Sequence, residues 1–435
     1  MYTFCFLCCI IAKEYILKGD VVMNKIKVGL IGFGNRGRLY SQFIKDLSDK
    51  VEYVAVCDYR INELLDSLKQ YNLKHTFADV EDFFNAKLDL DLVCICSMDK
   101  YHYYQTKKCL ELGYNVLLEK PVSNKLEEVI ELNNLAKEKN LKLIVSYVLR
   151  YTVFYKMIKD IIDSGEIGKV VNINNTENVA YWHHAHSYTR GNWKFEEETG
   201  PMILTKCSHD MDLIYWLMGK NVSKISSFGN RSYLLKENAP ENSTTYCIDC
   251  PSKDTCPFNA YRFYLNNKEW LRPIIGDDLS EENIMKNLYH SPYTMCAYKT
   301  NADVVDHQVV NILFDDKTTA SHTMNAYTRY CYRDIKVMGS HGCIEGNFEE
   351  KKFKVYHFVD NSEREVDITN YTDDFVGHGG GDRVMFIELI DYLLTGNKTK
   401  SLTSISESVM SHEMAFASEE SRLEDGQVKD INYKL

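Results

Sequence analysis

The chain has 435 residues, of which 45% are hydrophobic and 26% are charged. With 22 glycines and 7 prolines, this composition excludes disordered, collagen-like and low-complexity proteins. The length predicts two or three domains. A net charge of -11, without a long basic run, argues against nucleic acid as a partner.

The first 22 residues read as an extension that precedes the first domain. Residues 1–12 are apolar, but this run is too short to span a membrane and lacks the basic start and cleavage site of a secretion signal. Met23 opens a run typical of a first strand, and residues 18–20 can be encoded by a ribosome-binding sequence. We therefore expect residues 1–22 to be upstream DNA translated in frame, in a cytoplasmic protein without a membrane partner.

Residues 23–148 alternate short apolar runs with amphipathic stretches, which indicates strand–helix–strand units and a doubly wound parallel sheet. Strands are expected over residues 26–31, 51–57, 92–96, 115–118 and 142–148, and a helix over residues 126–139.

Residues 149–435 have longer strands that pair as hairpins. Runs 304–314 and 318–327 flank one turn, and runs 335–338 and 342–348 flank another. This pattern predicts an α+β domain with an open mixed or antiparallel sheet, which a cysteine-containing insertion over residues 236–298 interrupts.

A glycine-rich loop of the G-x-G-x-x-G type follows the first expected strand and opens a helix. It is the run Gly32-Phe33-Gly34-Asn35-Arg36-Gly37. Its glycines suit a tight turn, close approach of a pyrophosphate and close helix–strand contact. Asp58, about 20 residues later, is placed to accept hydrogen bonds from ribose hydroxyls and to repel a 2′-phosphate. NAD is therefore favoured, although Arg60 suits a 2′-phosphate and leaves NADP open.

The chain resembles the Gfo/Idh/MocA family of NAD(P)-dependent oxidoreductases. The motifs that carry the resemblance, in addition to the glycine loop and Asp58, are Cys96-Ser97 with His102, Glu119-Lys120-Pro121, Arg150, His209-Asp210-Met211-Asp212, Gly379-Gly380-Gly381-Asp382 and Ser421-Arg422-Leu423. The resemblance covers nearly everything after Met23. It implies a Rossmann domain, a C-terminal domain that supplies the substrate pocket and a homodimer or homotetramer, with cofactor contacts from Ser97, His102, Glu119, Lys120 and Arg150.

Oxidation of a secondary alcohol needs a base for the hydroxyl proton beside the nicotinamide. Lys120 stands at the end of an expected strand, where ligands of such sheets bind, and partial burial there would lower its pKa. His209 begins an apolar helix and is the expected partner, with Asp212 on the same face to orient the imidazole. Many relatives carry Asp four residues before this histidine. This chain has Thr205 there, followed by Lys206, which is a candidate for that role.

Residues 181–193 are rich in aromatic and histidine side chains, which suit a sugar because rings stack on its C–H face while polar groups bond its hydroxyls. The candidate substrate contacts are His183, His186, Tyr188, Arg190 and Trp193. A metal site and a plain surface loop are the alternatives. The run 188–191 also resembles a stretch in the family's NAD-dependent glycosidases.

Three cysteines in the insertion have the compact spacing of metal ligands, namely Cys247, Cys250 and Cys256. Cys296 is the candidate fourth ligand and His290 the next. Zinc is favoured over an iron–sulfur cluster because no further clustered cysteine appears, and reduced thiols without metal are the alternative.

Together these features predict an NAD-dependent dehydrogenase that acts on a secondary hydroxyl of a sugar or cyclic polyol. Lys120 and His209 are the expected acid–base pair. The alternatives are a redox-neutral glycosidase that recycles its NAD and a sugar sensor without catalysis on the same scaffold.

Overall fold

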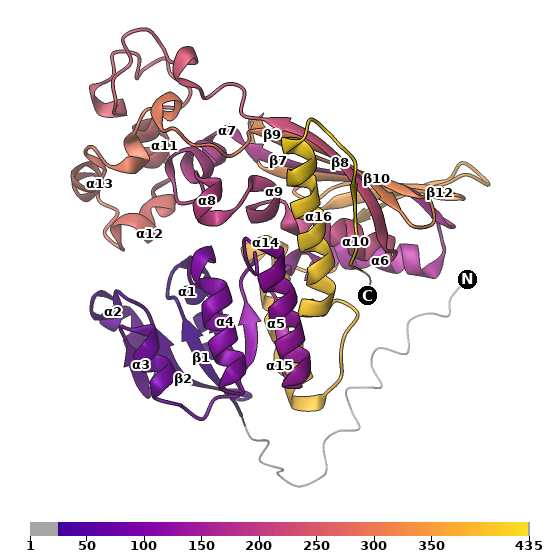
Figure 1. Ribbon diagram of the computed structural model, residues 1–435, viewed down its shortest axis with the longest axis horizontal. Helices are drawn as coiled ribbons and strands as arrows, with labels where there is room; N and C mark the ends of the chain where they lie inside the picture. The colour runs from indigo at the N-terminus through magenta and orange to yellow at the C-terminus, as the bar shows by residue number, and fades with distance from the viewer. Residues whose placement is uncertain (1–24, 434–435) are drawn as a thin grey trace.

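The structure, a computed structural model, describes residues 25–433. The extension expected over residues 1–22 lies outside the described residues. Within them are two sheets, one in each half of the chain, with helices packed on both (Figure 1).

The first sheet has six strands in the order β3-β2-β1-β4-β5-β6, and every neighbouring pair is parallel. The strands are β1 (Ile26–Ile31), β2 (Val51–Cys57), β3 (His75–Phe77), β4 (Leu92–Ile95), β5 (Asn115–Leu118) and β6 (Leu143–Val145). The helices of this half are α1 (Asn35–Asp46), α2 (Ile61–Leu68), α3 (Val80–Asn85), α4 (His102–Glu111) and α5 (Leu126–Glu138). Two apolar clusters cover its two faces, which is why its strands are apolar almost throughout.

The strand order of this sheet reverses between β1 and β4, so the expected doubly wound sheet is confirmed. Ligands of such sheets bind in the crevice at the carboxyl ends of the strands on either side of this reversal. The expected strand over residues 142–148 is shorter than predicted. The chain leaves the sheet after Val145 and enters the 3-10 turn η3 (Val148–Tyr151).

The second sheet has nine strands in the order β14-β13-β12-β11-β7-β10-β9-β8-β15. The strands are β7 (Val170–Ala180), β8 (Val222–Asn230), β9 (His307–Phe314), β10 (Thr319–Thr328), β11 (Tyr332–Gly339), β12 (Gly342–Asn347), β13 (Lys352–His357), β14 (Glu363–Asp367) and β15 (Lys429–Asp430). The expected hairpins β9–β10 and β11–β12 are confirmed, and β10 pairs in parallel with β7, so the sheet is mixed.

Two long C-terminal helices connect the halves of the molecule. Apart from the helices of the insertion, the remaining α-helices of the chain are α6 (Val153–Ser164), α7 (Tyr181–His184), α8 (Glu196–Thr199), α9 (Met202–Thr205), α10 (Ser208–Met218), α14 (Val376–Gly379), α15 (Gly381–Thr395) and α16 (Ile405–Leu423). Phe386 of α15 belongs to the core of the first sheet. In α16, Val409 packs into the first half and Met414 into the second. The C-terminal segment therefore returns to the nucleotide-binding half, which the sequence pattern does not reveal.

The insertion between β8 and β9 is a small helical unit with an apolar cluster of its own. Its helices are α11 (Ala260–Asn266), α12 (Arg272–Ile275) and α13 (Glu281–Leu288). The cluster includes Tyr264, Leu271 and Leu288. In Figure 1 the unit projects past α7 and α8 at one end of the molecule. Across residues 25–433, no helix is both long and apolar enough to cross a bilayer.

Candidate active site

The three glycines of the loop after β1 stand where a side chain would obstruct the backbone or a ligand. Gly32 has φ +91°, and a Cβ there would lie 2.7 Å from the backbone of Cys96. A Cβ on Gly37, in α1, would lie 2.0 Å from the carbonyl oxygen of Gly32. Gly34 instead has open space beside it and immediately precedes α1. The loop thus leaves room for an anion at a helix N-terminus, which attracts negative charge.

Asp58 ties this loop to the end of β2. Its Oδ2 accepts a hydrogen bond from the backbone nitrogen of Phe33 at 2.7 Å, and its Oδ1 accepts one from the backbone nitrogen of Arg60 at 2.9 Å. The Arg60 Nε lies 3.6 Å from the same Oδ1. Asn35 is exposed at the start of α1. These residues stand together at the crevice, where the sequence places the adenosine end of a dinucleotide.

Arg36 and Glu119, which the sequence assigns to the cofactor, form an ion pair with each other. The Arg36 Nε donates to Glu119 Oε1 at 2.7 Å, and its Nη2 donates to the hydroxyl of Tyr40 and to Asp382 of α15. Burial opposes ionisation of Glu119, but the Arg36 guanidinium outweighs it and the pKa of Glu119 lies below its ordinary value. The four side chains join α1, β5 and α15 beneath the crevice.

Ser97 and His102 also have structural partners rather than free polar atoms. The Ser97 hydroxyl donates to Gln105 at 2.6 Å. The buried His102 places its Nδ1 2.7 Å from the carbonyl oxygen of Pro121 and its Nε2 3.1 Å from that of Ser97. It therefore connects the loops after β4 and β5. Because the loop after β5 carries Lys120, His102 acts on the site by positioning that loop.

Lys120 stands at the end of β5, half-buried at the carboxyl edge of the sheet. Its Nζ donates to the carbonyl oxygen of Thr205 at 2.5 Å. No carboxylate forms an ion pair with it among residues 25–433. Burial lowers the pKa of Lys120, Lys206 adds to the shift, and Asp99 opposes it. Thr205 thus contacts the Lys120 amine through its backbone oxygen.

His209 is buried beside Lys120 in the first turn of α10. Its Nδ1 has no hydrogen-bond partner within the described residues. Burial lowers its pKa well below the ordinary value, and the charges of Lys120 and His378 add to that shift. The rings of His209 and His378 lie 5.5 Å apart, and His378 Nδ1 contacts Asp382 at 3.0 Å. His209 therefore favours the neutral imidazole and has a buried ring nitrogen without a hydrogen-bond partner among the described residues.

Lys206 belongs to a buried row of alternating charges below the site. Its Nζ lies 3.0 Å from Glu177, which also pairs with Arg333 at 2.6 Å. Arg333 in turn contacts Asp210 at 3.0 Å. Lys206 therefore acts on the site through its charge, while Glu177 holds its amine in place.

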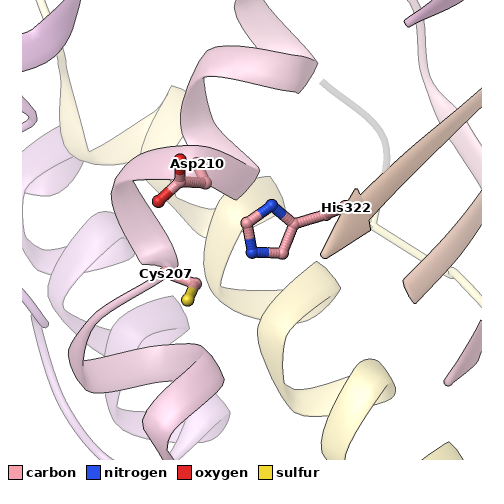
Figure 2. Close-up of side chains that lie close together, drawn as sticks. All are labelled: Cys207, Asp210 and His322. Carbon is pink, nitrogen blue, oxygen red and sulfur yellow. The ribbon is translucent and has the colours of Figure 1, made fainter. Parts of the chain in front are cut away.

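Cys207, Asp210 and His322 meet in the same region, with ligand atoms that all lie within 4.8 Å of one another (Figure 2). Cys207 and Asp210 come from the start of α10 and His322 comes from β10. Asp210 is already neutralised by Arg333. A cation in this cluster would face that guanidinium, so we interpret the three residues as part of the charge row.

Arg150, which the sequence predicts at the cofactor, and Asp212, which it predicts to orient His209, form a buried ion pair with each other. Their side chains are each 1% exposed. Arg150 donates to the two oxygens of Asp212 at 2.7 and 2.6 Å, and a third bond of 2.8 Å reaches Glu407 of α16. Both oxygens of Asp212 are therefore held by Arg150. The pair joins η3, α10 and α16 where the two halves meet.

An aromatic cluster from two segments lies on one side of the site. His183 and His186 each have ring centroids 5.0 Å from that of Trp270, which comes from the insertion. Trp182 stacks on His183, and Tyr293 of the insertion stacks on His186. Burial lowers the pKa of His186 to about 4 and holds that of His183 well below its ordinary value, so both rings are neutral at pH 7.

The other residues expected to contact substrate have partners within the protein. Tyr188 is buried and stacks on His184. The Trp193 Nε1 donates to Asp99 at 2.9 Å and so connects the two halves beside Lys120. Arg190 is buried and donates to the carbonyl oxygens of Met295 and Phe258 and to the Cys247 sulfur, so it serves the insertion rather than a substrate.

Sequence reasoning missed three residues of the site, namely Asp99, Trp270 and His378. They come from the loop after β4, the insertion and the segment before α15, far apart in the chain. For His378, the following glycines and Asp382 were a usable signal. Trp270 carried none, because its helical context resembles ordinary core packing.

Comparison with known proteins identifies relatives along most of the chain. An oxidoreductase family with an NAD-binding Rossmann fold matches residues 26–147, and the C-terminal α/β domain of that family matches residues 159–429. The chain is 24% identical over 385 residues to YteT, a putative oxidoreductase of Bacillus subtilis, which covers 82% of this chain and 87% of that protein. It is 24% identical over 214 residues to a myo-inositol 2-dehydrogenase of Thermotoga maritima, or 49% of this chain and 60% of that protein.

Solved structures show the same fold. A levoglucosan dehydrogenase in complex with NADH superposes with a TM-score of 0.70 at 16% identity, over 94% of this chain and all of the other. An oxidoreductase domain protein from Kribbella flavida gives a TM-score of 0.71 at 15% identity, over 94% and 100% of the two chains.

Proposed function

The chain belongs to the Gfo/Idh/MocA family of NAD(P)-dependent oxidoreductases, and from that premise we propose that it oxidises a secondary hydroxyl of a sugar or cyclic polyol with NAD. The observation that carries the proposal is the pair of Lys120 and His209 at the carboxyl edge of the first sheet. Both have a lowered pKa, and among residues 25–433 no carboxylate forms an ion pair with the lysine.

The chemistry follows from these two side chains. A deprotonated Lys120 Nζ accepts the proton of the substrate hydroxyl, and the neutral His209 imidazole holds the same oxygen by a hydrogen bond. As the carbonyl forms, the hydrogen on the carbon leaves as hydride. NAD, when bound in the crevice, supplies the nicotinamide C4 that accepts this hydride. In the reverse direction, the lysine ammonium returns the proton.

The glycine loop and Asp58 support a dinucleotide in the crevice. Gly34 leaves space at the start of α1 for the pyrophosphate, and Asp58 is placed to accept hydrogen bonds from ribose hydroxyls. The Asp58 carboxylate disfavours a 2′-phosphate, which makes NAD the proposed cofactor. The Arg60 Nε, 3.6 Å from Asp58, weakens the proposed preference for NAD over NADP but does not reverse it.

The aromatic cluster favours a carbohydrate or polyol. Rings from His183, His186 and Trp270 offer apolar faces and neutral ring nitrogens, which suit C–H faces and hydroxyls. The relatives named as inositol and levoglucosan dehydrogenases act on substrates of this class according to their names. The glycosidase alternative depends mainly on the run 188–191. Arg190 of this run is buried in contact with the insertion, which weakens that alternative.

The test is a substrate panel with two readouts. Purified protein is incubated with NAD or NADP and with sugars, cyclic polyols and aryl glycosides, while NAD(P)H absorbance and released aglycone are both recorded. We expect NADH formation with at least one sugar or polyol. Aglycone release without NADH would instead establish the glycosidase, and binding without turnover would establish a sensor. Light scattering of the same preparation tests the proposed homodimer or homotetramer.

A further inference from the structure

The four cysteines of the insertion surround one small cavity. Cys247, Cys250, Cys256 and Cys296 all line it. They come from three separate turns. The bridge between Tyr246 and Met295 brings the first and last turns together, and no disulfide joins the four thiols. Distant parts of the insertion therefore converge on this point.

The spacing of these thiols is wider than zinc requires. Tetrahedral zinc lies about 2.3 Å from each thiolate, so its thiolates stand about 3.8 Å apart and leave no space between them. The cavity lined by these cysteines instead has a volume of about 20 Å³ in which the centre of a water-sized group fits. Across residues 25–433, the cluster of Cys207, Asp210 and His322 is the one place where three potential metal-ligand atoms lie within 4.8 Å of one another. No three sulfurs of the insertion are therefore that close together. The expectation of zinc is therefore not supported.

An iron–sulfur cluster fits the wider arrangement. Its thiolates bind separate iron atoms and stand around a larger inorganic core, usually as a set of four cysteines. The four cysteines that line this cavity match that number of ligands.

Arg190 supplies an independent observation. Its guanidinium is buried and donates to two carbonyl oxygens and, at 3.8 Å, to the Cys247 sulfur. No carboxylate forms an ion pair with it among residues 25–433, although a buried cation without a counter-charge is unfavourable. A cluster held by four thiolates carries net negative charge and would supply the missing partner.

His290, the alternative fourth ligand considered from sequence, does not reach the cavity. Its Nε2 contacts Asp249 at 2.8 Å, and its ring stacks on Tyr246 and Tyr289. Cys296 is thus the fourth residue that the fold brings to the site.

We propose that Cys247, Cys250, Cys256 and Cys296 bind an iron–sulfur cluster that holds the insertion against the active site. The cluster would join the turns of the insertion, one of which carries Met295 next to Cys296. Arg190 donates to the Met295 carbonyl oxygen at 2.7 Å and lies in the same segment as His186. His186 in turn bonds Tyr264 at 2.8 Å and contacts Trp270. The metal centre would therefore set the position of the aromatic cluster, and it takes no part in hydride transfer.

The test is metal analysis of the full-length protein isolated without oxygen. We expect iron and acid-labile sulfide in matched amounts, with a broad visible absorption that disappears on reduction or on exposure to air. The iron count distinguishes a two-iron from a four-iron cluster. Zinc in place of iron, or neither metal after anaerobic reconstitution with ferrous iron and sulfide, would overturn the proposal.

Variants separate the cluster from incidental metal binding. Cys250→Ser and Cys256→Ser should lose most of the iron and sulfide, whereas Cys343→Ser, on β12 outside the cavity, should retain both. NAD binding by the separate first sheet should persist in all three variants, which shows that they fold. Iron that survives in the two cavity variants would contradict the assignment of these ligands.

Discussion

Asp212→Asn is expected to destabilise the protein without weakening substrate binding. Asp212 and Arg150 are each 1% exposed and share two hydrogen bonds of 2.7 and 2.6 Å. The amide removes one negative charge, but Arg150 keeps Glu407 at 2.8 Å. Removing one partner of a buried ion pair costs about 3 to 5 kcal/mol, and the remaining carboxylate places the expected loss near the lower end, at about 3 kcal/mol.

Urea unfolding at pH 7, followed by circular dichroism, measures this loss. The matched control is Asp163→Asn, which breaks a pair with Lys159 at 3.0 Å on the surface of α6. Surface pairs contribute little, so its free energy of unfolding should fall by less than about 1 kcal/mol. The KM values for NAD and for the sugar should change by less than about twofold in Asp212→Asn, since Asp212 is 1% exposed and both of its oxygens are bonded to Arg150.

The opposite pattern would refute the reasoning. If Asp212→Asn unfolded like the wild type but raised the KM for the sugar at least about tenfold, Asp212 would contact substrate and the sequence-based role would be correct. If Asp212→Asn instead lost only NAD binding, the role of Arg150 as a cofactor contact would be supported.

Three further changes test the site and its electrostatics. Lys120→Met should lower kcat by about 10²- to 10⁴-fold, while Lys125→Met, an exposed lysine in the following loop, should leave it unchanged in steady-state assays. Burial lowers the pKa of Lys120, and the base acts when deprotonated. The kcat of wild-type oxidation should therefore rise with pH to a plateau that begins below pH 10.5. A kcat that does not change with pH would exclude Lys120 as the base. Asp58→Asn should raise the KM for NAD about tenfold or more and reduce the preference for NAD over NADP. The reason is that a hydrogen bond from a ribose hydroxyl to the charged carboxylate contributes about 1.5 to 3 kcal/mol. Burial beside Glu419 raises the pKa of Glu196 to about 7, so the folded state binds more protons than the unfolded state between the two pKa values and stability falls as pH rises toward 7. Glu196→Gln should remove this slope and add about 1 to 2 kcal/mol at pH 8 in urea unfolding, and an unchanged slope would show that another group is responsible.

Local patterns were sufficient for the first half of the fold. Apart from the exposed edge strand β3, its strands are largely buried and so appear as short apolar runs, and β1, β2 and β5 occur where the sequence predicts them. The glycine loop was equally readable, because its requirements at Gly32 and Gly37 are steric and arise within a few residues. Lys120 was found for the same reason, since a strand end at the sheet edge is a local feature.

Only the tertiary structure decided which polar side chains remain available to a ligand. Arg150, Arg190 and Asp212 have the composition of binding residues, but burial forces each to find a partner, and those partners lie far away in the chain. His378 reaches His209 for the converse reason, because the C-terminal helices return to the first sheet. The sequence by itself thus determined the fold class, the phosphate loop and the candidate base. Long-range packing, through the cost of leaving charge unpaired in the interior, determined which other side chains a ligand can meet.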